Sequence, residues 1–190
     1  MAAPAQQPEQ PWRPTPAQLE AARGRSIPDV VGPGLRVLFC GINPGLYSAA
    51  VGHHFARPGN RFWPALFGAG FTDRLLSPFE DGRLLEWRLG CTNLVPRATA
   101  RAEELTAAEL ELGAERLREL VRRCRPGWLA VLGVGAYRAA FRAPQAAAGA
   151  QPESVESAGV WLLPNPSGLN AHYQLPDLVQ AFAKLRVAAS

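Results

Sequence analysis

The sequence predicts an α/β fold of three layers, in which a central, mainly parallel sheet is covered by helices on both faces. Four short runs are apolar along their length and are bounded by turn residues: 35–40, 90–95, 128–132 and 160–163. Helical patterns of apolar residues lie between these runs. Strands that are apolar on both faces and alternate with helices are typical of a parallel sheet buried between two helical layers.

The helices and one long loop are predicted from capping residues, apolar spacing and composition. Thr15 followed by Pro16 gives an N-cap and a proline at the first helical position, which predicts a short helix to Ala22. Residues 143–157 are rich in Ala, Gln, Gly, Pro and Ser and are predicted to form a surface loop. The apolar spacing predicts the other helices over 60–67, 79–89, 106–124, 134–141 and 176–185.

The length of 190 residues suits one domain, which we place at 15–190. Residues 1–14 are rich in Pro, Gln and Ala and are predicted to be a disordered tail. The net charge of +4 and the pI near 9.4 are compatible with DNA binding but are not diagnostic of it. The sequence has no signal peptide and no apolar run long enough to cross a membrane, so a soluble cytoplasmic protein is expected.

Metal and redox chemistry are not indicated. The three cysteines, Cys40, Cys91 and Cys124, form no C-x-x-C motif, and no metal or organic cofactor is expected. His53 and His54 have no metal-ligand partner pattern. We interpret this pair as a surface turn or as part of the lining of a pocket entrance.

The turn after the first predicted strand presents a polar side chain at the carboxyl edge of the sheet, where open α/β sheets bind ligands. The strand 35–40 is followed by Gly41-Ile-Asn-Pro-Gly45, in which the two glycines permit backbone angles that other residues avoid. Asn43 offers one acceptor and two donors without a net charge. Such an amide suits the holding of a water molecule or a base edge, and it is a poor nucleophile.

A second loop has the same design. The strand 160–163 leads into Pro164-Asn-Pro-Ser-Gly-Leu169, which prolines and a glycine make stiff. Both loops could meet at one edge of the sheet, although each is also compatible with an ordinary turn. A third turn, Gly133-Val-Gly135, resembles the start of a dinucleotide-binding loop, but Arg138 stands where the third glycine would be. We interpret it as a tight connection from strand to helix.

Three motifs together resemble the mismatch-specific uracil-DNA glycosylases, the bacterial branch of the family that includes thymine-DNA glycosylase. They are Gly41-Ile-Asn-Pro-Gly45, then Phe55-Ala-Arg-Pro-Gly-Asn-Arg-Phe-Trp63, then Asn165-Pro-Ser-Gly-Leu169, and they occur in the family's order. The similarity runs roughly from Leu35 to Leu185. It implies a uracil-DNA glycosylase-like fold and an enzyme that needs no metal, since three cysteines cannot supply the four of the iron–sulfur branches.

The resemblance implies catalytic and base-binding roles for several residues. Asn43 would orient the attacking water, and Asn93, at the end of the strand 90–95, would either assist it or merely cap its strand. Phe55 would stack on the extruded base, unless it is a core residue. The resemblance also assigns substrate-binding roles to the backbone N–H of Ile42, to Ser48 and to Asn165.

The resemblance also implies a group of DNA contacts. Leu169 would be the wedge that enters the gap left by the extruded nucleotide, and the backbone near Gly168 would meet the orphaned guanine. Bacterial relatives carry an arginine two positions after the wedge, where this chain has Ala171. Asn170 and His172 are the neighbouring polar residues, and His172 could substitute for the arginine.

The function predicted from these motifs is a monofunctional DNA glycosylase that starts base excision repair. It would extrude uracil, and related pyrimidines such as etheno-cytosine or thymine, from mismatches with guanine in double-stranded DNA, as a monomer associated with the bacterial nucleoid. One alternative is a non-catalytic module that binds damaged or single-stranded DNA on the same scaffold. Another is a small-molecule α/β enzyme or nucleotide-binding protein, as the 133–135 turn could suggest.

Overall fold

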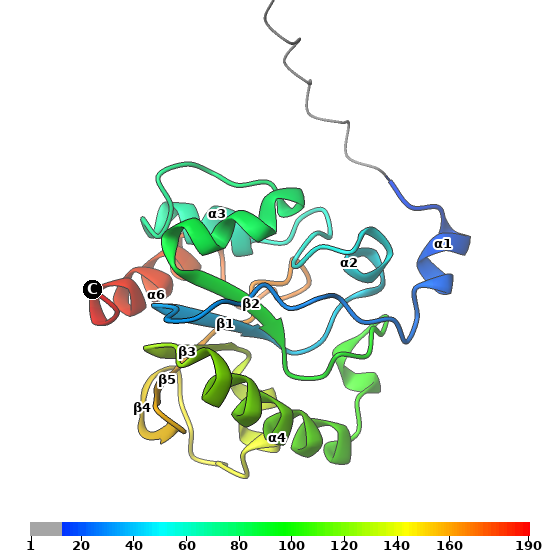
Figure 1. Ribbon diagram of the computed structural model, residues 1–190. Coiled ribbons are helices and arrows are strands. Elements are labelled where there is room, and N and C mark those ends of the chain that lie inside the picture. The colour runs from blue at the N-terminus through cyan, green and yellow to red at the C-terminus, as the bar shows by residue number, and fades with distance from the viewer. Residues whose placement is uncertain (1–12) are drawn as a thin grey trace, which may run out of the picture.

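A five-stranded sheet forms the centre of the protein, as the computed structural model, which describes residues 13–190, shows (Figure 1). The strand order is β2-β1-β3-β5-β4. The first four strands in this order are parallel, and β4 pairs with β5 in the antiparallel direction. The strands are β1 (Val37–Gly41), β2 (Leu89–Asn93), β3 (Trp128–Leu132), β4 (Gly149–Val155) and β5 (Ala158–Leu163).

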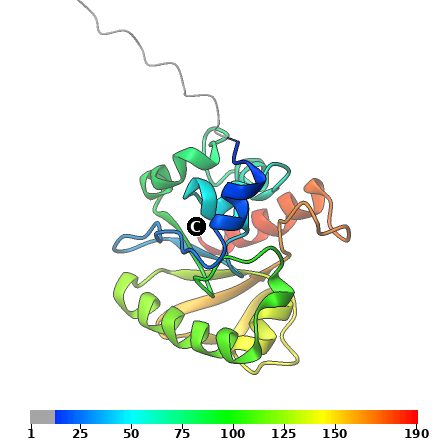
Figure 2. The same cartoon turned by 90° about the vertical axis from the view of Figure 1, so that its right-hand side faces the viewer.

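Helices cover both faces of the sheet, which gives the predicted three layers (Figure 2). The helices are α1 (Pro16–Ala21), α2 (Leu46–Val51), α3 (Phe62–Gly68), η1 (Pro78–Trp87), η2 (Ala102–Glu104), α4 (Ala107–Cys124), α5 (Val134–Ala140) and α6 (Leu175–Ala188). Alternate residues of a strand point to opposite faces, so Phe39 packs with α3, η1 and α6, while Leu38 and Cys40 pack with α4 and α5.

Most predicted elements are present within one to three residues of their predicted ends. The segment predicted as a helix over 79–89 is a 3-10 helix, η1. Ser77 caps its start, and it ends at Trp87, since the next residue, Arg88, has a left-handed backbone conformation. All three cysteines are buried and free. The predicted tail, residues 1–14, lies almost entirely outside the described residues.

The prediction of a surface loop over 143–157 was wrong in part, because residues 149–155 form the edge strand β4. Only Val155 of this strand is buried. Its polar, exposed residues and Pro152 give no apolar alternation, which is usual for an edge strand whose register is interrupted, here between Ala150 and Ser154. The strand therefore had no hydrophobic signal in the sequence.

The sheet brings the two polar loops to one edge. In the parallel pair β1–β2, Gly41 lies opposite Asn93, so Asn43 and Asn93 follow or end neighbouring strands. Strand β5 ends at Leu163 on the same edge, and the loop that begins at Pro164 follows it. The carboxyl edge of the sheet is thus the place where the motifs of the sequence meet.

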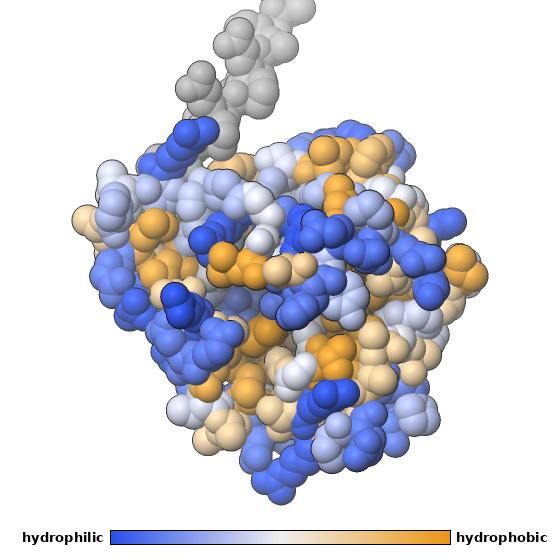
Figure 3. Space-filling model, turned by 180° about the vertical axis from the view of Figure 1, so that it is seen from behind, coloured by the Kyte–Doolittle hydropathy of each residue, from blue (hydrophilic) through white to orange (hydrophobic). Residues whose placement is uncertain are grey.

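The outer surface carries hydrophilic residues between smaller hydrophobic patches on the face seen in Figure 3. None of the helices in residues 13–190 is long and apolar enough to cross a membrane.

Close packing between α4 and the sheet leads to a prediction for Gly113. A Cβ atom at Gly113 would lie 2.6 Å from the backbone oxygen of Leu94, whereas one at Gly135 in α5 would meet nothing within 4 Å. We expect Gly113→Ala to lower the free energy of unfolding by about 1–3 kcal/mol, because overpacking strains the core. Gly135→Ala is the matched control and should raise it by about 0.5 kcal/mol. Urea denaturation of both variants tests this; equal effects would contradict it.

Candidate active site

A cavity of about 480 Å³ opens at the carboxyl edge of the sheet. It is lined by residues of all three motifs and of the segment that follows β2. Eight of the residues predicted from the sequence line it: Ile42, Asn43, Ser48, Phe55, Asn93, Asn165, Leu169 and Asn170. Gly168 lies in the same loop as the last three, whereas His172 lines a separate cavity beside α6.

Gly41 is required at the floor of this cavity because there is no room for a side chain. A Cβ atom there would lie 2.7 Å from Asn93 Oδ1 and 3.2 Å from Cε1 of Phe55. Neither Gly41 nor Gly45 uses the backbone angles that glycine permits and other residues avoid: Gly41 is the last residue of β1, and Gly45 has a φ of −74° as the N-cap of α2. The close approach of the Asn93 and Phe55 side chains explains why position 41 requires a glycine.

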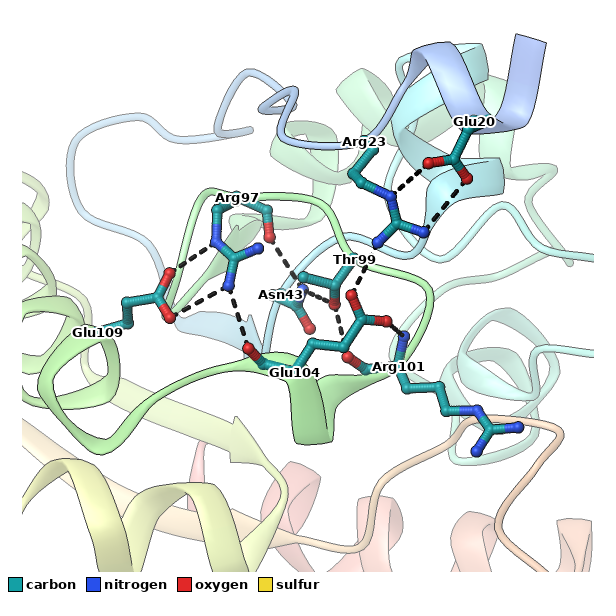
Figure 4. A network of polar contacts seen from close by, with 8 residues as sticks. All are labelled: Glu20, Arg23, Asn43, Arg97, Thr99, Arg101, Glu104 and Glu109. Atoms are coloured by element: carbon teal, nitrogen blue, oxygen red, sulfur yellow. Dashed lines mark hydrogen bonds and ion pairs between the residues drawn. The ribbon is translucent and has the colours of Figure 1, made fainter. Parts of the chain in front are cut away.

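The carboxamide of Asn43 is held by the segment after β2. Its Nδ2 donates to the backbone oxygen of Arg97 at 2.9 Å and to Thr99 Oγ1 at 2.7 Å (Figure 4). Thr99 Oγ1 in turn donates to the oxygen of Arg101 at 2.7 Å, so it accepts from Asn43. Both donors of the amide are therefore used, and Oδ1 accepts no hydrogen bond from the described residues.

Ion pairs fix the segment that holds Asn43 (Figure 4). Arg97 donates through Nε to Glu109 of α4 at 2.6 Å, and Glu104 receives Arg23, which follows α1, at 2.8 Å. The hydrogen bonds of Glu109 with Arg97 and with the Thr106 backbone lower the pKa of its carboxyl group to about 2, so that it is charged at neutral pH. These ion pairs connect α4, and the residues that follow α1, to the segment that holds Asn43.

His54 is buried next to Asn93, with 1% of its surface exposed. Its placement in a surface turn was wrong, and the alternative of a residue that lines the cavity is confirmed. The ring lies 3.0 Å from the backbone oxygen of Pro28 through Nε2 and 3.4 Å from Asn93 Nδ2 through Nδ1. Burial lowers the pKa of His54, which favours the neutral ring. His53 is more exposed and pairs with Asp81.

An aromatic side chain forms one wall of the cavity. Phe55 is half-buried, and its ring stacks on Phe62 with centroids 4.1 Å apart. Its backbone has a φ of +54°, an uncommon conformation for a bulky residue. Ser48 supports this stretch, since its Oγ accepts from the N–H of Ala56 at 3.0 Å. Phe55 is thus a cavity residue that leans against the core rather than a residue enclosed within it.

Arg61 connects the second motif to the third. Its backbone N–H donates to the oxygen of Pro166 at 3.0 Å, and its guanidinium donates to the oxygens of Ser167, Asn170 and Tyr173. A Cβ atom at Gly168 would lie only 2.6 Å from the oxygen of Gly59, so the loop 165–170 packs directly on the second motif. One arginine and one glycine therefore fix the position of this loop.

The residues of the third motif divide into internal supports and one exposed apolar side chain. Asn165 Oδ1 accepts from the N–H of Ser167, and Asn170 uses both ends of its amide within the loop. His172 is exposed. Leu169 is 68% exposed at the mouth of the cavity.

The sequence was compared with models of known protein families. The model described as the uracil DNA glycosylase superfamily matches residues 28–186. The chain belongs to this superfamily. Its members are hydrolases that act as glycosylases on DNA, and the mainly parallel sheet between two helical layers agrees with their fold.

Most of the polar groups that line this cavity are neutral. Among the described residues that line it, Glu103 is the one carboxylate, and it is exposed at the rim. No group of three or more His, Cys, Asp or Glu side chains in residues 13–190 is arranged to hold a metal ion. The site can bind and orient through amides and backbone groups, but among the described residues it holds no strong base next to Asn43.

Several residues that shape the site were not found from the sequence. Thr99 and Arg97 lie in a stretch without a motif, and only the fold brings them to Asn43. Arg61 lies inside the second motif, so its position there was the one available signal. His54 was noticed, but its burial depends on partners distant in the sequence.

The support of Asn43 by Thr99 can be tested by substitution. Thr99→Val removes one of the two acceptors of Asn43 Nδ2 at nearly constant shape, so the amide is held by the Arg97 oxygen alone and is less firmly oriented. We expect glycosylase activity in single turnover to fall about tenfold, which corresponds to about 1.4 kcal/mol in the barrier. Thr99→Ser is the matched control and should retain most of the activity. Equal losses in both variants would show that the shape of the side chain, not the hydroxyl, matters.

Proposed function

We propose that this protein is a monofunctional, mismatch-specific uracil-DNA glycosylase, which extrudes uracil paired with guanine and hydrolyses its glycosidic bond. The observation that carries the proposal is the meeting of three motifs at one cavity. Asn43 presents a free amide oxygen there, Phe55 an aromatic face, and Leu169 an exposed apolar side chain at the rim. These are the parts needed to orient water, hold a base and fill a gap in a base stack.

In this proposal Asn43 orients the water. Its Nδ2 is bound to the Arg97 and Thr99 oxygens, so its Oδ1 would accept a hydrogen bond from a water directed at C1′ of the nucleotide. The C1′–N1 bond breaks, and its electron pair leaves with the uracil as an anion. The water oxygen then bonds to C1′ and loses a proton to solvent. Because an amide is too weak a base to deprotonate the water, the C1′–N1 bond is largely broken before the water attacks.

The same contacts explain why an amide fits this position better than a carboxylate. An aspartate at position 43 would turn an acceptor toward the Arg97 backbone oxygen, where Asn43 places a donor. Two oxygens without a hydrogen between them repel each other. The chain therefore favours a neutral residue here.

Base binding in this proposal uses three groups. The uracil would stack on the open face of Phe55, whose other face lies on Phe62. The backbone N–H of Ile42 would donate to a carbonyl oxygen of the base and stabilise the charge that develops on it. The amide of Asn93 would contact the base edge opposite the sugar.

DNA contacts in this proposal surround the cavity. Leu169 would enter the duplex as a wedge on the loop that Arg61 fixes. Arg57 and Arg101 also line the cavity, are exposed and form no ion pair with the described residues, and the Arg101 guanidinium points away from the network in Figure 4. They are candidates for the phosphate contacts that the arginine absent at Ala171 would otherwise make.

The test of this function is a cleavage panel. Duplexes with uracil opposite guanine, uracil opposite adenine, thymine opposite guanine and etheno-cytosine opposite guanine, and a single-stranded uracil substrate, are incubated with the protein and then with alkali. We expect a strand break at uracil opposite guanine. Asn43→Ala should reduce single-turnover cleavage about a hundredfold, or about 2.7 kcal/mol in the barrier, with nearly unchanged binding to an abasic duplex. Binding without cleavage by the unaltered protein would indicate a non-catalytic DNA-binding module instead.

The wedge is tested separately. Leu169→Ala should lower cleavage of duplex substrate much more than cleavage of single-stranded uracil, because only the duplex requires the gap to be filled. Since Leu169 is exposed, thermal stability should not change. Equal losses on both substrates together with a lower melting temperature would assign Leu169 to the core of the loop.

A further inference from the structure

Four hydrogen bonds hold His54 in one position behind the cavity. Its backbone N–H donates to Asp81 at 2.9 Å, and its backbone oxygen accepts from Trp63 Nε1 at 3.3 Å. The ring contacts Pro28 at one nitrogen and Asn93 at the other. The backbone is held by the first two contacts, and the ring, which is 1% exposed, cannot turn without breaking the other two.

These partners determine which ring nitrogen carries the proton. The oxygen of Pro28 can only accept, so Nε2 of His54 must be protonated to hydrogen-bond with it at 3.0 Å. In the neutral ring Nδ1 is then bare and accepts. The titratable groups that act on the ring are Asp81, Asp29 and His53, and their effects are smaller than that of burial, which lowers the pKa of His54. The ring is therefore neutral at neutral pH.

The bare Nδ1 fixes the orientation of the Asn93 amide. Only the NH₂ end of Asn93 can face an acceptor, and it does so at 3.4 Å. The oxygen end then lies in front of Gly41, where a Cβ atom would be 2.7 Å from Oδ1, next to the edge of the Phe55 ring. Oδ1 accepts no hydrogen bond from the described residues, and Asn93 lines the cavity.

We propose that His54 is a positioning residue that sets base specificity: by accepting from Asn93 Nδ2 it keeps the Asn93 oxygen directed at the base site, which favours bases with an N3–H donor. Uracil and thymine carry this hydrogen, whereas the unprotonated N3 of a cytosine is an acceptor. An oxygen fixed in place would pair with the first class and repel the second. This inference rests on the proposed function, because it assumes that the base enters between Phe55 and Asn93.

The size of the effect follows from the burial of these groups. A buried polar group that faces the wrong partner disfavours that ligand strongly, because water cannot replace the missing hydrogen bond. If the acceptor on His54 is removed, the Asn93 amide can rotate and present its NH₂ end, which an N3 acceptor can use. The preference for bases with an N3–H donor should then weaken, because cytosine-like bases bind better and uracil-like bases bind less well.

The experiment uses two matched bases, 5-formyluracil and 5-formylcytosine, each opposite guanine. They share the electron-withdrawing substituent and differ at N3 and at position 4. Single-turnover cleavage gives a ratio of rates for each protein, and comparison of ratios between variants cancels the intrinsic reactivity of the two bases. We expect His54→Phe to reduce the preference for 5-formyluracil about tenfold, or about 1.4 kcal/mol. His54→Gln, which can both donate to Pro28 and accept from Asn93, should retain most of the preference.

A double-mutant cycle tests whether His54 acts through Asn93. Asn93→Leu should also reduce the ratio, and His54→Phe combined with Asn93→Leu should reduce it no further. An additive loss, or a ratio that His54→Phe leaves unchanged while Asn93→Leu lowers it, would overturn the inference. Melting temperatures identify a variant that fails to fold, and in that case His54→Leu, which also lacks an acceptor for Asn93 Nδ2, replaces His54→Phe in the cycle.

A binding measurement separates this inference from the proposed function. The same two bases are placed in 2′-fluoroarabino nucleotides, which resist cleavage, and the affinity ratio is measured. If the unaltered protein cleaves no substrate, the proposed function fails, and a His54-dependent affinity ratio would still support the specificity role. If it cleaves uracil but neither ratio depends on His54, the specificity role fails and the glycosylase function stands.

Discussion

The close approach at the end of β1 is the constraint on which the candidate site depends. Gly41 leaves space that the Asn93 amide and the Phe55 ring occupy, at 2.7 and 3.2 Å from where a Cβ atom would be. A larger residue would push apart these two side chains of the cavity wall. Because β1 and β2 are parallel and in register, the same pairing that forms the sheet places Asn93 beside Gly41. The pairing of β1 with β2 therefore also places Asn93 in the cavity.

Around this point the protein uses neutral groups whose orientation is fixed by second partners. The Asn43 amide has both donors bound, and the Asn93 amide is turned by the neutral ring of His54. An amide has two ends of opposite hydrogen-bonding character, so a site built from amides works only when each end is assigned. Behind this layer, ion pairs of Arg97 with Glu109 and of Arg23 with Glu104 brace the backbone that holds Asn43.

The rim of the cavity is built differently, since the proposed wedge Leu169 is an exposed apolar side chain. Leu169 lies on a loop in which the carbonyl oxygens of Ser167 and Asn170 turn toward Arg61. The guanidinium replaces the water that these oxygens would otherwise bind, and the loop keeps one shape without a hydrophobic core of its own. If DNA binds here as proposed, no binding energy is lost on ordering the loop.

The α/β class, the four parallel strands and the three motifs could be predicted from the sequence, because apolar periodicity and turn residues act over a few neighbours. It also indicated Asn43, Phe55 and Asn93 as residues of one cavity, through the rule that parallel strands end on one edge and through the resemblance of the motifs. The contacts that hold these residues could not be predicted in this way. His54 meets Pro28 across 26 residues, Asn43 meets Thr99 across 56, and Arg61 meets Ser167 across 106. Such hydrogen bonds depend on the relative placement of whole elements, and no local pattern encodes them.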